Sequence, residues 1–294
     1  MRRELIEALD LLHSGEPEGV QRAVALMQGT VFSFSMKVCG HREDAEDTMQ
    51  DVLMRSLPHL AKIKDPQALA VWLYTVTRNR CWRSRRRPAH APNSTLSLDE
   101  LMPDEGELQR MLQDTSPGPE ESALRGENDR ILHKAVLSLP PQYRLVLVLH
   151  DMEDLETEQV AAIMGLKPGT VRVRLHRARL GVRKAMAQLL EGKAISLSNK
   201  PAKETGTRRH PPSEECKKMF AGLSEYLEGR LAPVTCDQMQ KHMDSCPACV
   251  AFLRELAAAI QRCREFDIAC DPDVSNRLVA LIAEEFHRLR GQTT

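Results

Sequence analysis

The sequence predicts an all-α protein in which helical domains alternate with two polar linkers. Aromatic residues make up only 4% of the 294-residue chain, whereas Leu, Ala, Arg and Glu are plentiful, a composition that favours helices packed on aliphatic side chains. Apolar residues recur every three or four positions over most of the chain, which is the spacing of one helix face. A chain of this length is expected to form two or three domains.

Charge is distributed in blocks although the totals cancel. The chain has 41 Lys and Arg residues and 41 Asp and Glu residues. Residues 78–87 hold six arginines, whereas residues 99–121 hold eight acidic residues and one arginine. Blocks of this kind indicate a nucleic-acid surface beside an acidic linker.

Residues 1–88 are predicted to form the first helical domain. One apolar series runs over 20–38 and ends at Gly40, which is suited to a helix C-cap. A second series runs over 45–60, and a third follows Asp65-Pro66 and stops at Pro88.

Composition sets the remaining boundaries. Prolines and acidic residues give segment 89–125 little capacity to bury a core, and 192–213 forms a second linker. A helical unit is expected over 126–191 between them. Residues 214–270 contain six of the eight cysteines, and an amphipathic C-terminal helix is predicted within 271–294.

A helix-turn-helix is predicted in the second helical unit. Residues 158–164 show a short helical pattern, with Thr157 as candidate N-cap and the glycine-containing turn 165–170 after it. The next helix places aliphatic residues on one face and cations on the rest. These cations are Arg172, Arg174, His176, Arg177, Arg179 and Arg183. The layout is typical of a DNA-binding motif whose second helix enters the major groove; the alternative is an arginine-rich surface helix of an ordinary bundle.

Aromatic and basic side chains are interleaved in the first domain, over 72–83. Aromatic rings stack on unpaired bases and cations follow the backbone, so Asn79, Arg80 and Arg83 are predicted to contact nucleic acid. Trp72 lies on the apolar stripe, which favours a core position for it. The alternative for the arginines is a solvated surface.

A metal site is predicted from Cys216, His242, Cys246 and Cys249. His242 and Cys246 are one helical turn apart, and the Cys-x-x-Cys turn brings in a second thiolate. Three sulfurs and one imidazole complete a closed tetrahedral Zn²⁺ site, which is structural rather than catalytic.

Three alternatives remain open for these cysteines. They could be buried free thiols, the Cys-x-x-Cys pair could be a redox dithiol, or Cys236 could replace Cys216 as a ligand. Cys263 and Cys270 lie beyond the motif, where they are packing residues or a second metal or redox pair.

The first two helical units together resemble the extracytoplasmic-function (group IV) sigma factors of bacterial RNA polymerase. The resemblance covers about residues 18–190, and its motifs occur in the order of the family. The matching segments are 42–52, 72–79, 139–144, 158–161 and 169–179.

The resemblance implies specific roles for these residues. The family's core-polymerase contacts correspond to Asp44, Asp47, Gln50, Asp51 and Arg55. Contacts to the −10 promoter element correspond to Lys62, Lys64, Trp72, Asn79, Arg80 and Arg83. The helix that begins at Val171 would bind the −35 element, and the acidic linker would pass near the RNA exit path. The polymerase does the chemistry, so no catalytic residue is expected and the chain is not expected to be an enzyme.

Residues 211–266 resemble the zinc-binding anti-sigma domain. The matching residues are Cys216, segment 223–231 and segment 242–249. The resemblance implies a short helical bundle that is held together by zinc and grips a sigma factor. Such a domain usually belongs to a separate protein, whereas here it is fused to the sigma factor.

We therefore expect an alternative sigma factor whose fused zinc domain contacts the sigma domains and responds to oxidants or metals. The competing function is an interaction protein that sequesters another sigma factor; a dithiol oxidoreductase has little support because no strands alternate with the helices. No run of about 18 apolar residues occurs, so no membrane partner is expected. The lack of a signal-peptide core predicts a cytoplasmic protein with reduced cysteines.

Overall fold

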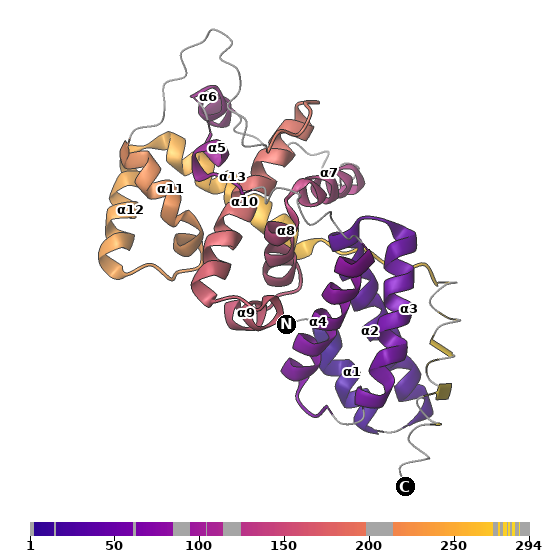
Figure 1. Ribbon diagram of the computed structural model, residues 1–294. Helices are drawn as coiled ribbons and strands as arrows, with labels where there is room; N and C mark the ends of the chain where they lie inside the picture. Colours follow the sequence, from indigo (N-terminus) through magenta and orange to yellow (C-terminus); the bar gives the residue numbers. More distant parts are fainter. Residues whose placement is uncertain are drawn as a thin grey trace. The chain divides into compact units, whose positions relative to one another are not determined.

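The structure, a computed structural model, describes residues 3–14, 16–60, 63–84, 95–103, 105–113, 125–197 and 214–272, with isolated positions beyond 272. Every regular element in these segments is helical, which confirms the predicted all-α class (Figure 1). No helix within them is long and apolar enough to cross a membrane. The C-terminal helix predicted over 271–294 lies mostly outside the described residues.

The chain divides into two compact units, and each is described by itself. Unit 1 comprises residues 1–92, 145–172 and 264–294, and unit 2 comprises 93–144 and 173–263. The division differs from the boundaries predicted from composition, because the helix-turn-helix begins in unit 1 and its second helix continues into unit 2.

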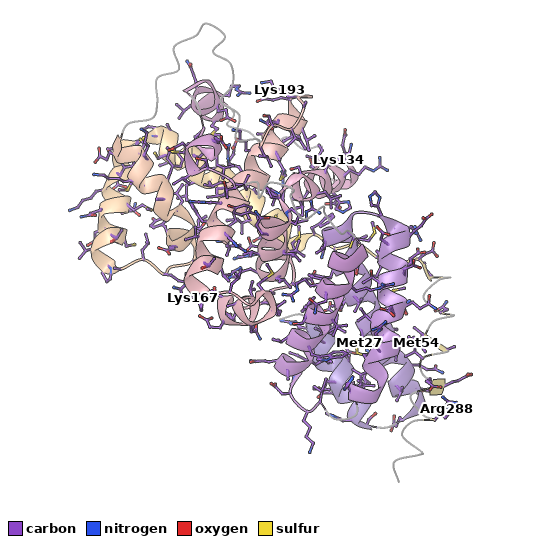
Figure 2. The ribbon with its side chains drawn as sticks, in the orientation of Figure 1. Met27, Met54, Lys134, Lys167, Lys193 and Arg288 are labelled. Carbon is purple, nitrogen blue, oxygen red and sulfur yellow. The ribbon has the colours of Figure 1, made fainter. Side chains whose placement is uncertain are left out.

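Unit 1 begins with four packed helices. Helix α2 packs against the other three, and its C-cap Gly40 has φ 78° and donates its N–H to the Met36 carbonyl at 2.9 Å, as predicted. Met27 on α2 is fully buried, whereas Met54 on α3 is 39% exposed (Figure 2). The helices are α1 (Arg3–Ser14), α2 (Pro17–Cys39), α3 (Arg42–Leu60) and α4 (Pro66–Ser84).

The remainder of unit 1 brings the first helix of the helix-turn-helix against α4. After α8 (Pro141–Leu147) and a π-helical turn, η1 (Val148–Met152), the chain forms α9 (Thr157–Met164). The guanidinium of Arg78 on α4 donates to the carbonyl of Ile163 on α9. The prediction that Thr157 is the N-cap of α9 is wrong by one residue. Glu156 has the extended cap conformation and donates its N–H to Gln159 Oε1 at 2.9 Å, while Thr157 is buried.

Unit 2 is built around the long helix α10 (Pro168–Leu190), of which it contains the part from Val173 onward. Segments on both sides of α10 in the sequence contribute helices to this unit. They are α5 (Leu98–Leu101), α6 (Glu105–Gln113), α7 (Arg125–Ser138), α11 (Glu214–Leu227), α12 (Pro233–Ser245) and α13 (Pro247–Glu265).

Part of the acidic linker packs into unit 2, which differs from the expectation that it has little capacity to bury a core. Leu96 and Leu101 are each 1% exposed, and the Leu96 N–H donates to the Tyr143 hydroxyl at 3.2 Å. Gly181 on α10 lies against this part of the linker. A Cβ atom there would be in ordinary contact with Leu96 at 3.4 Å, but it would lie 2.7 Å from the end of the Leu139 side chain, which would have to shift.

Candidate metal centre and nucleic-acid-binding surfaces

Three cysteines and one histidine of unit 2 converge on one point. Cys216 lies near the start of α11, His242 near the end of α12, Cys246 at its C-cap and Cys249 in the first turn of α13. Their ligand atoms all lie within 4.8 Å of one another. His242 Nε2 is 3.6 Å from Cys216 Sγ and 3.3 Å from Cys249 Sγ, and these two sulfurs are 3.7 Å apart.

Helix termini create this convergence. Cys246 leaves the helical conformation at φ −126° and ψ 89°, and Pro247 then starts α13. The N–H of Cys249 donates to the Cys246 carbonyl at 3.1 Å, which closes the turn between the two thiols. Phe220 and Phe252 pack edge to face with ring centroids 4.6 Å apart, joining α11 to α13 in the same unit.

The donor set fits a tetrahedral ion. With zinc–sulfur bonds of about 2.3 Å, neighbouring ligand atoms of a tetrahedron are ~3.8 Å apart, close to the separations measured here. Burial raises the pKa of the Cys249 thiol, and the neighbouring Cys246 and Cys216 raise it further. Without a cation the Cys249 thiol therefore stays protonated, and a divalent cation would favour its thiolate.

The other C-terminal cysteines lie apart from this cluster. Cys236 is half-buried on α12 and is absent from the set of converging ligand atoms, so the structure brings Cys216 rather than Cys236 to the site. Cys263 is buried on α13. Cys270 is half-buried in unit 1, and burial, followed by the Glu46 carboxylate, raises the pKa of its thiol.

The cations predicted to bind DNA on α10 form two groups that differ in exposure. Arg172 is exposed, as is Lys167 in the preceding turn (Figure 2). Arg174, His176 and Arg177 are half-buried. By contrast, the two later arginines, Arg179 and Arg183, are only 1% and 2% exposed.

Each buried arginine is paired with a carboxylate of the C-terminal segment. Arg179 Nη1 lies 2.6 Å from Glu228 Oε1. Arg183 Nη1 lies 3.0 Å from Glu255 Oε2, and its guanidinium stands 4.5 Å from the Phe252 ring centroid. Neither glutamate belongs to a sequence motif that predicts this pairing. No local signal could have predicted it, since Arg183 and Glu255 are 72 residues apart in the chain.

His176 joins α10 to α11. Its Nδ1 lies 2.9 Å from Ser224 Oγ. Burial, together with the nearby charges of Arg179 and Arg177, lowers the pKa of His176 from 6.5 to about 4. The imidazole is therefore neutral at pH 7, unlike the arginines beside it.

The residues predicted to bind the −10 element are mostly exposed where they can be described. Lys64, Asn79 and Arg80 are exposed. Trp72 is half-buried, and its ring centroid lies 5.6 Å from that of His59. Lys62 lies outside the described residues, as does the side chain of Arg83 on α4.

The five residues predicted to bind polymerase all lie on α3 and all reach the surface. Asp47, Gln50 and Arg55 are exposed, whereas Asp44 and Asp51 are half-buried. Asp51 pairs with Arg55 at 2.9 Å, and its other oxygen lies 3.2 Å from Nε of Arg80. The predicted polymerase-binding and −10-binding residues are thus adjacent on α3 and α4.

Three segments of the chain match models of known families. Residues 24–90 match Sigma-70 region 2, and residues 129–180 match Sigma-70, region 4. Residues 223–249 match a family described as "Putative zinc-finger".

Several curated proteins are similar to the sigma-like part of the chain. "Probable RNA polymerase sigma factor RfaY" of Xanthomonas campestris is 31% identical over 175 residues, which cover 60% of this chain and 42% of the relative. RNA polymerase sigma factor YlaC of Bacillus subtilis is 28% identical over 56% of this chain and 90% of the relative. ECF RNA polymerase sigma factor SigE of Mycolicibacterium smegmatis is 30% identical over 54% of this chain and 58% of the relative.

The chain spans less than half the length of RfaY but nearly the whole length of YlaC. Along this chain the region 2 match comes first, the region 4 match second and the zinc-finger match last. The chain therefore contains sigma-70 regions 2 and 4 followed by a C-terminal region of zinc-finger type, and its sigma-like part is similar to RNA polymerase sigma factors, including one of the extracytoplasmic-function type.

Proposed function

We propose that this chain directs a bacterial RNA polymerase to a set of promoters and that its C-terminal domain, by binding zinc, regulates this activity. The observation that best supports the proposal is the ordered match to sigma regions 2 and 4. The partners are then core polymerase and promoter DNA, and the protein acts in the cytoplasm, where the polymerase works. Catalysis belongs to the polymerase, so we assign this chain no catalytic residue.

The −35 element is assigned to the exposed side of α10. Arg172 is exposed and Arg177 is half-buried at the start of this helix. Guanidinium groups can contact guanine edges in two places at once, while further cations hold phosphates. Helix α10 follows a short helix and a turn with Gly165 at φ 66°, which is the geometry that a major-groove helix requires.

The −10 element is assigned to Lys64, Asn79 and Arg80, all of which are exposed. Binding of core polymerase is assigned to the exposed residues of α3. Asp51 links the residues assigned to polymerase with those assigned to the −10 element, because it pairs with Arg55 on its own helix and with Arg80 on α4. These ion pairs keep the arginines oriented before either partner binds.

The zinc ion is assigned to Cys216, His242, Cys246 and Cys249. The set of three sulfurs and one imidazole leaves no open position for a substrate, so the bound ion has a structural role. It would hold the start of α11, the end of α12 and the start of α13 together. Because a small helical domain has a limited core, the metal would supply much of its folding free energy.

The C-terminal domain is proposed to restrain α10. Glu228 and Glu255 neutralise Arg179 and Arg183, two cations that the sequence assigns to DNA. While these pairs persist, the two guanidinium groups are withheld from phosphates. Oxidation of the ligand thiols, or loss of the metal, would loosen α11–α13 and release them, which makes the domain responsive to oxidants or metals.

The test is transcription by the full chain with core polymerase on fragmented genomic DNA. The chain is assayed with zinc and after metal removal, and RNA 5′ ends are mapped. We expect start sites that are absent with core alone and that share two upstream elements. Arg172→Ala should reduce these transcripts, whereas Lys134→Ala, at an exposed position on α7, should not. A chain that gives no new start sites in either metal state and does not bind core polymerase would overturn the proposal.

A further inference from the structure

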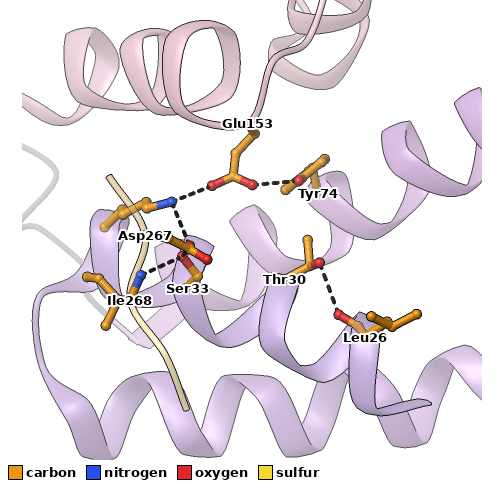
Figure 3. Close-up of polar contacts among 8 residues, drawn as sticks. Leu26, Thr30, Ser33, Tyr74, Glu153, Asp267 and Ile268 are labelled. Atoms are coloured by element: carbon orange, nitrogen blue, oxygen red, sulfur yellow. Dashed lines mark hydrogen bonds and ion pairs between the residues drawn. The ribbon is translucent and has the colours of Figure 1, made fainter. Parts of the chain in front are cut away.

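A lysine is completely buried inside unit 1. Lys37, on α2, is 0% exposed, and its Nζ lies 3.0 Å from Oε1 of Glu153, which is also 0% exposed (Figure 3). The other carboxylate oxygen of Glu153 accepts a hydrogen bond from the Tyr74 hydroxyl at 2.7 Å. The pair therefore joins α2 and α4 of the region 2 segment to the turn before α9 in the region 4 segment.

A second carboxylate reaches the same lysine from the C-terminal segment. Asp267 Oδ1 lies 3.4 Å from Lys37 Nζ and accepts a hydrogen bond from Ser33 Oγ at 2.5 Å. The Ile268 N–H donates to Ser33 Oγ at 3.4 Å (Figure 3). Phe266 is 6% exposed, and its ring centroid is 5.9 Å from Nζ. We name Lys37, Glu153, Tyr74, Asp267 and Ser33 the Lys37 cluster.

The backbone around Glu153 is built to place its carboxylate. The π-helical turn η1 ends immediately before it, and the Glu153 N–H closes that turn on the Val148 carbonyl at 2.9 Å. The next residue, Asp154, has φ 55°, the left-handed conformation. Single π-turns and left-handed residues other than glycine are uncommon and occur often at functional positions, since the fold must hold them in place.

Two buried charges of this kind stabilise each other only while they remain together. Removing either partner leaves an unpaired charge in the core, which is strongly unfavourable. Moving the turn before α9 away from α2 therefore requires that water reach both charges. Asp267 differs from Glu153, because its side chain is 58% exposed and can leave the cluster into water.

Binding to a promoter requires the region 2 and region 4 segments to separate. The −10 and −35 elements are roughly 25 base pairs apart, which is ~85 Å along the duplex at about 3.4 Å per base pair. In unit 1, α4 and α9 are in direct contact through Arg78 and Ile163. Helix α9 is joined by a short turn to α10, the helix assigned to the −35 element. While α9 touches α4, the start of α10 and α4 cannot reach both elements at once, so this arrangement has to open before a promoter is bound.

We propose that the Lys37 cluster holds α2 and α4 against the turn before α9, and we call this contact the lock. Asp267 makes the strength of the lock depend on the C-terminal domain. The proposal rests on the sigma function proposed above. Asp267 follows α13 by two residues, and the first turn of α13 contains the candidate ligand Cys249. The metal centre and the lock are thus joined by one helix. Loss of order at the start of α13 weakens the hold of its far end on Lys37, and Glu153 is then the only carboxylate of the cluster that still pairs with the lysine.

Two variants of the full chain test the lock. Asp267→Asn removes the exposed carboxylate alone. The double variant Glu153→Gln with Tyr74→Phe removes the buried carboxylate and the hydroxyl that donates to it, and so leaves the Lys37 charge without its buried counter-charge. Glu7→Gln is the matched control, because it removes an exposed ion pair of the same unit, that of Glu7 with Arg22 at 2.5 Å.

Hydrogen exchange of peptides spanning 148–156 and 30–40, and titration of core polymerase, are the two measurements. A minor open state of about 1–10% limits apparent affinity, so opening the lock should strengthen polymerase binding by roughly 10- to 100-fold for the double variant. Asp267→Asn should have a smaller effect of the same sign, with faster exchange in both peptides. Metal removal should speed exchange of these peptides in the wild type, but not further in Asp267→Asn.

Exchange and affinity equal to wild type in both variants would overturn the lock. If the double variant does not fold, Asp267→Asn decides the question, since its change lies at the surface. If the chain does not bind polymerase, the proposed sigma function is wrong. The hydrogen-exchange measurement would still test the lock, because it does not depend on polymerase.

Discussion

The Nη1 atom of Arg179 lies 2.6 Å from Oε1 of Glu228, and the Arg179 side chain is only 1% exposed. Arg179 comes from α10, the helix assigned to the −35 element, and Glu228 directly follows α11. A guanidinium keeps its charge when it is buried, so it needs a carboxylate beside it. This pairing holds the C-terminal segment on α10.

Glu228→Gln should destabilise the protein, because it removes the carboxylate that lies 2.6 Å from the buried Arg179 guanidinium. The Glu228 side chain is 12% exposed, so we expect a loss of about 3 kcal/mol in the free energy of unfolding. Urea denaturation followed by circular dichroism measures it. Glu225→Gln, on an exposed position of α11, should change stability by less than about 0.5 kcal/mol. Equal effects of the two substitutions would contradict the buried pair.

Acid should weaken the contact of His176 with Ser224. The folded pKa of about 4 lies below the unfolded value of 6.5, so between these values the unfolded chain binds a proton that the folded chain does not. Stability is therefore highest above pH 6.5 and falls as the pH drops towards 4, by about 3 kcal/mol for this group.

The measurement is the free energy of unfolding as a function of pH for wild type and His176→Gln. The variant should show a shallower loss between pH 6.5 and 4. His41→Gln, at an exposed position, serves as the control and should keep the wild-type slope. If His176→Gln retains the full wild-type slope, the histidine is not the responsible group.

The metal content should depend on Cys216 and not on Cys236. Cys216→Ser removes a ligand of the four-atom cluster, whereas Cys236 lies outside it. We expect about one zinc per wild-type chain and per Cys236→Ser chain, and much less in Cys216→Ser, by elemental analysis of the purified proteins. The thermal midpoint should fall only for Cys216→Ser. The reverse pattern would show that Cys236, and not Cys216, is the metal ligand.

Promoter binding should depend on the exposed group of α10 cations more than on the buried group. Arg172→Ala should weaken holoenzyme binding to its promoters by about 1–3 kcal/mol, with little effect on folding, since Arg172 is exposed. Band-shift titration on fragments selected by the wild-type holoenzyme measures this. Arg179→Ala should instead lower stability first. Loss of folding in Arg172→Ala, or wild-type binding by it, would argue against this division.

Local patterns predicted the helices and the cysteine–histidine cluster that the structure brings together. Gly40 ends α2 because only a left-handed residue allows that C-cap, and the sequence contains this information directly. The spacing of His242, Cys246 and Cys249 similarly encodes the turn that joins two thiols to one imidazole. Thr157 shows the limit of such rules, because the neighbouring Glu156 provides the alternative cap that forms.

Tertiary pairings were not predictable in this way. Periodicity places Arg179 and Arg183 among the cations of α10, but it cannot show that glutamates far along the chain bury them. The acidic linker was expected to lack a core, but Leu96 and Leu101 pack into unit 2 beside Gly181. Lys37 lies within an apolar series, and only the fold brings Glu153 to it.

Run-off transcription by the full chain, with zinc content measured on the same samples, tests the central claim most directly. The metal is removed with a chelator and restored before core polymerase is added. We predict that metal removal raises the yield of the chain's own transcripts and that restored zinc lowers it again. Transcript yield that stays constant or falls while the zinc is lost would contradict the proposed restraint of transcription by the C-terminal domain.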